Sequence, residues 1–176
     1  MTLSKCITIL SVSASLALAL SAGSVAAQGA PPYLSYAAKF ACGTALLDAD
    51  VVKGVYATSV NIHNPQNVTP VNFLKKFVVA LQEGQSFQQP IVLNSNEVLG
   101  PDLAERVDCP LIASHITPKP DLTKVHIEGF VVIEVPQTST SGTTLVLDVV
   151  AKYSARGGAT GFTVVKIPPT PIGAGL

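Results

Sequence analysis

Alternation of apolar and polar residues with a period of two dominates the second half of the chain. In residues 125–135 every second position is apolar or glycine, and several of the positions between them are charged. The pattern recurs in residues 145–153, and residues 162–167 form a third apolar segment after a glycine-rich turn at 154–161. A period of two is typical of a β-strand with one buried face. We therefore predict three strands in this part of the chain.

The first half contains one clear strand pattern and one weaker one. Residues 55–63 alternate between two faces and end at Asn64-Pro65, which disfavours continuation of a regular element. Residues 36–42 fit a first strand less well because they are rich in alanine. Residues 46–53 are expected to form a turn.

Residues 71–81 fit two different patterns. Their apolar residues form a helical stripe, with Thr69 as a possible cap and Pro70 at the first helical position. The same segment also alternates as a strand does, and the β-branched pair Val78-Val79 lowers its helix propensity. We predict a strand that pairs across the turn at 64–70 with the strand before it.

One short helix is predicted at residues 101–107. Pro101 suits the first helical position, and Asp102 and Glu105 lie in the early turns, where the helix dipole favours negative charge. Two apolar residues four positions apart share a face of this segment. The helix leads directly to Cys109, and Pro110 is expected to stop it.

These elements predict the fold class and the domain boundaries. Several strands separated by turns, without alternating helices, indicate an all-β fold, and we predict an antiparallel β-sandwich with immunoglobulin-like architecture. The single domain is expected to span residues 35–167. It follows a flexible lead-in at 28–34, and a loose C-terminal tail follows it at 168–176, because both segments are rich in proline.

Residues 1–27 have the pattern of a secretory signal peptide. Lys5 precedes an apolar stretch, and the small residues Val25 and Ala27 suit cleavage before Gln28. Cleavage one residue earlier and an uncleaved membrane anchor are the alternatives. The prediction is an exported protein, periplasmic or extracellular, with no membrane span after removal of the signal.

Two cysteines remain after the predicted cleavage. Cys42 and Cys109 lie 67 residues apart, and an even pair in an oxidising compartment is most simply a disulfide. Two free buried thiols are the alternative. Neither cysteine has a second one at the spacing of a zinc site, so no metal ligation is predicted.

Composition and motifs argue against several kinds of chemistry. Only 12% of the residues are charged and the net charge is +0, which excludes nucleic-acid binding driven by basic charge. No catalytic, cofactor-binding or metal-binding motif is present, so we predict no enzyme activity and no cofactor. His63 and His126 fall on the polar faces of their strands and are expected to be solvated. Asp48 and Asp50 suit a turn better than a weak calcium site.

Short segments along most of the predicted domain resemble a widespread family of secreted bacterial hypothetical proteins. These segments are residues 36–43, 54–58, 61–65, 75–76, 107–109, 129–133 and 147–151. The resemblance implies a compact, β-rich exported domain with a cysteine pair. It implies no activity, because the family carries none that is assigned.

Three functions remain open at this point. The first is a non-catalytic secreted or periplasmic binding domain that recognises a protein or cell-surface partner through loops or a sheet edge. The second is a cell-surface structural subunit, similar to a pilin or a coat protein, that self-associates through strand edges. The third is a small hydrolase with a dispersed site.

Overall fold

The computed structural model describes residues 32–46, 51–80, 91–137, 144–157 and 161–173. It has nine strands and one short helix within these residues. The predicted signal peptide and the turn aspartates at 48 and 50 lie outside them. The elements are β1 (Tyr33–Ala45), β2 (Gly54–His63), β3 (Val71–Val79), β4 (Ile91–Leu99), β5 (Ala104–Asp108), α1 (Cys109–Ser114), β6 (His126–Pro136), β7 (Asp148–Gly157), β8 (Gly161–Ile167) and β9 (Thr170–Ile172).

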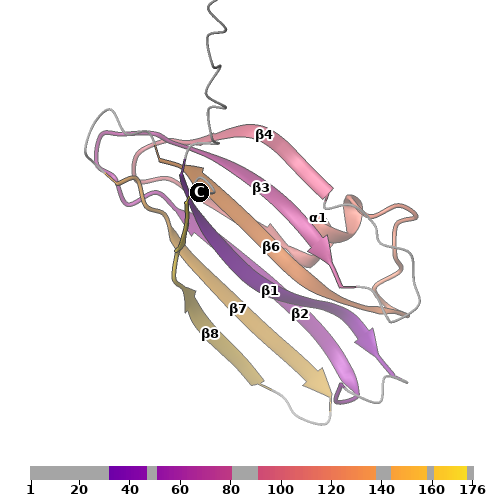
Figure 1. Cartoon of the computed structure of the whole chain (residues 1–176). Helices are drawn as coiled ribbons and strands as arrows, with labels where there is room; N and C mark the ends of the chain where they lie inside the picture. The colour runs from indigo at the N-terminus through magenta and orange to yellow at the C-terminus, as the bar shows by residue number, and fades with distance from the viewer. Residues whose placement is uncertain (1–31, 47–50, 81–90, 138–143, 158–160, 174–176) are drawn as a thin grey trace, which may run out of the picture.

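All the strand pairs are antiparallel, which confirms the predicted all-β class. The strands hydrogen-bond into one sheet in the order β4-β3-β6-β1-β2-β7-β8, with β5 paired to β2 and β9 paired to β1 (Figure 1). The predicted sandwich of two separate sheets is not confirmed, because β1 and β2 pair with each other and make the hydrogen bonding continuous.

Strand β2 is the place where this sheet forks. Only its first residues, Gly54 to Tyr56, pair with β1, whereas Ser59 to His63 pair with β5. Strand β7 runs along β2 from Gly54 to His63. A strand has two edges, so β5 takes the place on β2 that β1 leaves after Tyr56. The two halves of the sheet can therefore turn their apolar faces toward each other beyond the fork.

The core contains the inward-facing residues of the long strands. Alternate positions of β1, β2, β3, β6 and β7 are buried, as expected for strands with one apolar face. The largest fully buried side chains are Tyr36, Phe40, Phe77, Ile62, Ile112 and Ile133. Across the core, the hydroxyl of Tyr36 accepts a hydrogen bond of 2.9 Å from the backbone N–H of Leu147.

Residues 71–79 of the segment at 71–81 form a strand, as predicted, and residue 81 lies outside the described residues. The predicted pairing with the strand before it is wrong, because β2 pairs with β1, β5 and β7 instead. Strand β3 pairs with β4 on one side and with β6 on the other, so its backbone groups are used on both edges. The alternation of buried and less buried residues along Val71–Val79 is the one that the strand pattern predicted. Strand β4, which the sequence analysis did not predict, forms the edge of the sheet beyond β3.

The predicted helix at 101–107 is wrong. Asp102 has a positive φ of 55°, and its backbone N–H lies 3.1 Å from the Asn64 carbonyl and 3.2 Å from the Gln66 carbonyl. The chain then continues as β5, because the open edge of β2 offers hydrogen-bond partners to an extended backbone. Local helix signals are weak, and a vacant sheet edge overrides them.

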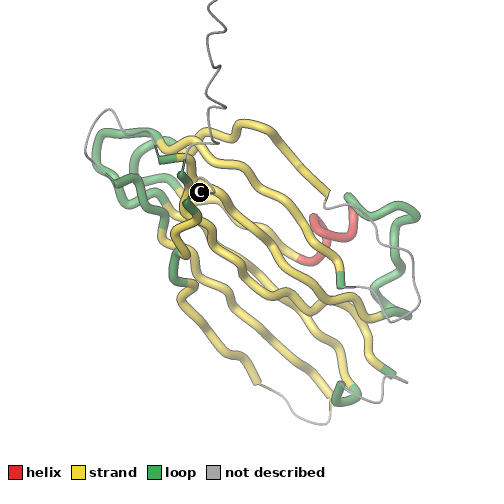
Figure 2. Tube along the Cα trace, in the orientation of Figure 1, coloured by secondary structure: helices red, strands yellow, loops and turns green. Residues whose placement is uncertain are grey.

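The helix of the structure begins where the sequence analysis expected one to end. Asp108 caps α1 by accepting a hydrogen bond of 3.2 Å from the backbone N–H of Leu111. Pro110 lies in the first turn, where no backbone N–H is needed, so it starts the helix instead of stopping it. The helix and the loops after it lie at one end of the sheet (Figure 2). Among the described residues, none belongs to a helix that has the length and apolar character to cross a membrane.

The predicted ends of the domain also need correction. Tyr33 and Leu34, assigned to the flexible lead-in, belong to β1 and pair with β6. Residues 170–172, assigned to the loose tail, form β9 and pair with the start of β1. Strand β7 continues to Gly157 instead of turning at residue 154. Prolines at 168 and 169 redirect the chain so that it returns to an edge that accepts a short strand.

Asn64 joins three backbone segments at the end of β2. The residue is fully buried, and its Nδ2 lies 2.9 Å from the carbonyl oxygens of Thr69 and Leu99 and 3.1 Å from that of Gly100. Its Oδ1 accepts a hydrogen bond of 3.0 Å from the backbone N–H of Gln66. The side chain therefore provides hydrogen bonds to groups that the strands leave unpaired.

Asn64→Ala is expected to lower the free energy of unfolding by about 2–3 kcal/mol, because it leaves several polar groups without partners. Urea denaturation followed by circular dichroism measures the change. Asn61→Ala is the matched control, since Asn61 is exposed on β2, three residues before Asn64, and its replacement should change stability by less than about 0.5 kcal/mol. Equal effects of the two substitutions would contradict this assignment.

Candidate functional site

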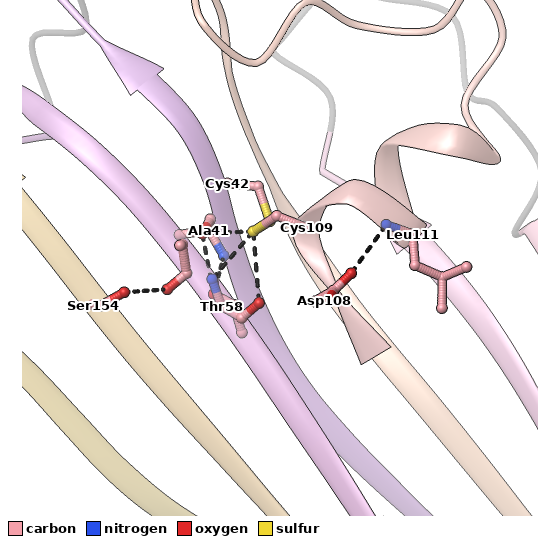
Figure 3. The surroundings of a disulfide bond; sticks show 8 residues. Ala41, Cys42, Thr58, Asp108, Cys109, Leu111 and Ser154 are labelled. Atoms are coloured by element: carbon pink, nitrogen blue, oxygen red, sulfur yellow. Dashed lines mark hydrogen bonds between the residues drawn. A yellow bond between two sulfur atoms is a disulfide. The ribbon is translucent and has the colours of Figure 1, made fainter. Parts of the chain in front are cut away.

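The structure brings Cys42 and Cys109 together at the fork of the sheet. Their sulfurs are 2.04 Å apart and their Cα atoms 5.5 Å apart, as the predicted disulfide requires. Cys42 lies on β1 and Cys109 begins α1, and both side chains are buried (Figure 3). The bridge therefore ties β1 to the strand and helix that replace it on β2.

Thr58 completes this fork from β2. Its hydroxyl donates to the carbonyl of Ala41 over 3.0 Å and accepts from the Ala41 N–H over 2.9 Å (Figure 3). Its backbone N–H lies 3.1 Å from Sγ of Cys109. The hydroxyl thus replaces the backbone pairing that β1 and β2 lose as they separate. Buried and satisfied, these groups have a structural role.

The histidines are placed on separate elements. His63 is half-exposed, with Nε2 3.2 Å from Asp102 and Nδ1 3.9 Å from Asp148. His126, expected to be solvated, is instead partly buried, and its ring centroid lies 5.3 Å from that of Tyr56. Within the described part of the chain, no group of three or more His, Cys, Asp or Glu side chains is placed to hold a metal ion.

Strand β8 is exposed along almost its whole length. Residues 161–166 are all exposed, although both faces of a strand inside a sheet are usually covered at least in part. Phe162 is 72% exposed, Val164 56% and Val165 40%, which is unusual for three apolar side chains within four residues. The apolar residues at 162–167 predict this strand but not its exposure.

Strand β8 is also an edge strand. It pairs with β7 from Val149 to Ala155, and no other strand among the described residues pairs with it (Figure 1). Its far edge therefore presents backbone N–H and C=O groups to solvent. The strand contains no proline, and Lys166 is its one charged residue. It thus has few of the features that usually protect an edge from pairing.

A shallow groove of about 500 Å³ lies on the outer face of β2, β7 and β8. The strand register places Ala57, Ser154 and Phe162 side by side across these three strands. The small side chains of Ala57 and Ser154 leave the hollow between the larger ones. The remaining principal lining residues are Val55, Lys152 and Arg156. The groove therefore combines apolar surface with two cations.

These two cations differ from the other basic residues of the same face. Lys166 lies 2.8 Å from Asp148, and Arg106 lies 3.5 Å from Asp108. Lys152 and Arg156, by contrast, form no ion pair with a carboxylate of the described residues. The ammonium of Lys152 instead lies 5.4 Å from the centroid of the Phe162 ring. The groove thus carries a local excess of positive charge.

The pair of Lys166 and Asp148 helps to hold β8 on β7. The hydrogen bond from Lys166 is the main cause that lowers the pKa of the Asp148 carboxyl. A carboxyl whose pKa is lowered by folding stabilises the fold at pH values above its ordinary pKa. This contribution is lost as the pH falls through the lowered pKa. Because both side chains are well exposed, the contribution is small.

Comparison with protein-family models, with curated proteins and with solved structures finds no match to this chain.

Proposed function

We propose that the chain is an exported, non-catalytic interaction domain that binds an extended segment of a partner protein at the free edge of β8. The observation that supports this proposal is the strand itself, which is unpaired on one edge and exposed on both faces. Addition of a strand to such an edge is a common mode of peptide recognition, in which backbone hydrogen bonds contribute affinity and alternate side chains contribute specificity.

Export is part of the same proposal. A buried disulfide between Cys42 and Cys109 suits an oxidising compartment. The signal-like pattern of residues 1–27 provides the independent support. The bridge at the fork of the sheet also fixes β1 to the start of α1 covalently.

Two proline substitutions in β8 test the binding edge. Successive N–H groups of a strand point to opposite edges, so Val164→Pro and Val165→Pro together remove one donor from the β7 side and one from the free edge. We expect the variant that loses the free-edge donor to bind probe peptides about tenfold more weakly or worse. The loss reflects about 1 kcal/mol for the hydrogen bond and the added steric clash.

Fluorescence anisotropy with labelled heptapeptides of alternating valine and glutamate, valine and threonine, or valine and lysine measures this binding. Val98→Pro on the opposite edge strand β4 is the control and should leave binding unchanged. The proposal is wrong if no peptide binds, or if both β8 variants bind as the unmodified chain does. Loss of binding in Val98→Pro alone would move the site to β4.

Self-association uses the same edge and is the competing function. A second copy of the chain would be the partner in a structural subunit, and light scattering of the protein alone distinguishes the two cases. We expect a monomer. A defined oligomer or a growing polymer that the β8 proline variants abolish would favour the structural subunit.

A further inference from the structure

We infer that the segment recognised at β8 alternates acidic and apolar side chains, with the acidic ones on the outer face of the sheet. This inference rests on the proposed binding at β8 and adds the chemistry of the partner. It follows from the different surfaces that the two faces of β7 and β8 present to a strand added at the edge.

The outer face provides the positive charge. Lys152 and Arg156 alternate with inward-facing residues of β7, and Lys166 belongs to the same face because it pairs with Val150. Lys152 pairs with Val164 of β8, and its ammonium lies over the ring of Phe162. Its charge is therefore held above the edge strand and not over the middle of the sheet.

An added strand lies about 4.8 Å beyond β8, within reach of a long side chain held over that strand. Its outer-face residues follow one another at about 7 Å, so acidic residues at alternate positions of the partner pass close to the Lys152 ammonium. Arg156 lies four residues further along β7, next to Ala155, which pairs with the first residue of β8. Since Lys152 and Arg156 have no carboxylate partner among the described residues, the pairing requires no existing ion pair to break.

The opposite face of the same strands is apolar. Val165 and Thr163 lie on this face, opposite Ala151 and Tyr153 of β7. Tyr56, Tyr153 and Thr163 contribute to a second shallow groove of about 320 Å³. Alternate apolar side chains of an added strand would cover Val165, which is 40% exposed. The charge of Lys39 acts on Tyr153, but Lys39 is paired with Glu128 at 2.9 Å, so it offers acidic side chains on this face less than the cations of the outer face do.

The three heptapeptides separate this inference from the proposal on which it rests. We expect the peptide of valine and glutamate to bind about tenfold more tightly than that of valine and threonine, with that of valine and lysine weakest. The preference should shrink as ionic strength rises, because the cations are exposed. If the three peptides bind equally well, the edge is a binding site but the inferred chemistry is wrong.

The double variant Lys152→Glu, Arg156→Glu tests the assignment to these residues. It is expected to reverse the order of the three peptide affinities, so that the peptide of valine and lysine binds most tightly. The affinity for the peptide of valine and threonine should stay within about twofold of that of the unmodified chain. Lys119→Glu, in the exposed loop after α1, carries the same kind of charge change and should leave the order intact. An unchanged order in the double variant would overturn the inference, whereas absence of all binding would overturn the proposed function itself.

Discussion

Replacing Cys42 and Cys109 together by alanine is expected to lower the free energy of unfolding by about 4 kcal/mol, because the bridge closes a long loop in the unfolded chain. The two cysteines are 67 residues apart, and loop-closure entropy rises with the logarithm of that separation. Urea denaturation of the oxidised chain and of the double variant gives the difference directly. A loss below about 1 kcal/mol would contradict the role assigned to the bridge.

The position of the bridge predicts which elements lose local stability first when the bridge is absent. Cys109 starts the helix that follows β5, and Cys42 lies on β1, whose place on β2 is taken by β5 after Tyr56. We expect amide exchange in the double variant to quicken first in β5 and α1, which few other contacts hold. Reduction of the unmodified chain by dithiothreitol should produce the same pattern, which controls for the loss of the sulfur atoms themselves.

Lys75→Met is expected to lower the free energy of unfolding by about 3–5 kcal/mol. Lys75 is only 3% exposed, lies among buried apolar residues of β3 and forms ion pairs with Glu97 and Glu105. Its Nζ lies 3.0 Å from Oε2 of Glu97. Removing the ammonium takes away the cation that both carboxylates share, and the loss of an ion-pair partner in a partly buried position is costly. Thermal and urea denaturation both measure the effect.

Two further variants show whether charge is the cause. Lys39→Met removes an ion pair with Glu128 whose side chains are 56% and 40% exposed, so it should change stability by less than about 1 kcal/mol. Adding Glu97→Gln and Glu105→Gln to Lys75→Met should restore part of the lost stability, because it removes the uncompensated charges. If the triple variant is no more stable than Lys75→Met, the ion pairs are not the source of the effect.

The strands that the sequence predicts well are those with a local signal. Residues 55–63, 125–135 and 145–153 alternate because one face of each strand is buried, and this pattern needs no knowledge of neighbouring strands, although β7 itself begins only at Asp148. The same alternation also marks one charged residue as buried, which was not predicted above. Lys75 alternates along β3 with the same spacing as Val71, Phe73 and Phe77, so it lies on the buried face of the strand. A charged residue in that position predicts a nearby side chain of opposite charge.

Elements that depend on pairing with distant strands could not be predicted in this way. Residues 101–107 carry helix signals, yet their structure is decided by the vacant edge of β2, which exists only because β1 leaves it after Tyr56. Residues 170–172 form a strand because the start of β1 accepts one. Neither of these unpaired strand edges can be recognised from the local sequence.

The candidate site falls into the same category. The strand at 162–167 was predicted from its apolar residues, which are equally typical of a strand buried inside a sheet. Its exposure depends on the order of strands, since β8 is last in a series that begins at β4. The cations of the groove come from β7, so their place over the edge strand required the register of the two strands.

Amide-resolved hydrogen exchange of residues 162–167, with and without the heptapeptide of alternating valine and glutamate, tests the binding edge most directly. Backbone N–H groups of an edge strand alternate between its paired and its open edge. We predict that the amides on the open edge exchange rapidly in the protein alone and become protected when the peptide binds, while those paired with β7 change little. If bound peptide leaves every amide of β8 unchanged, the binding edge lies elsewhere and the proposed function is wrong.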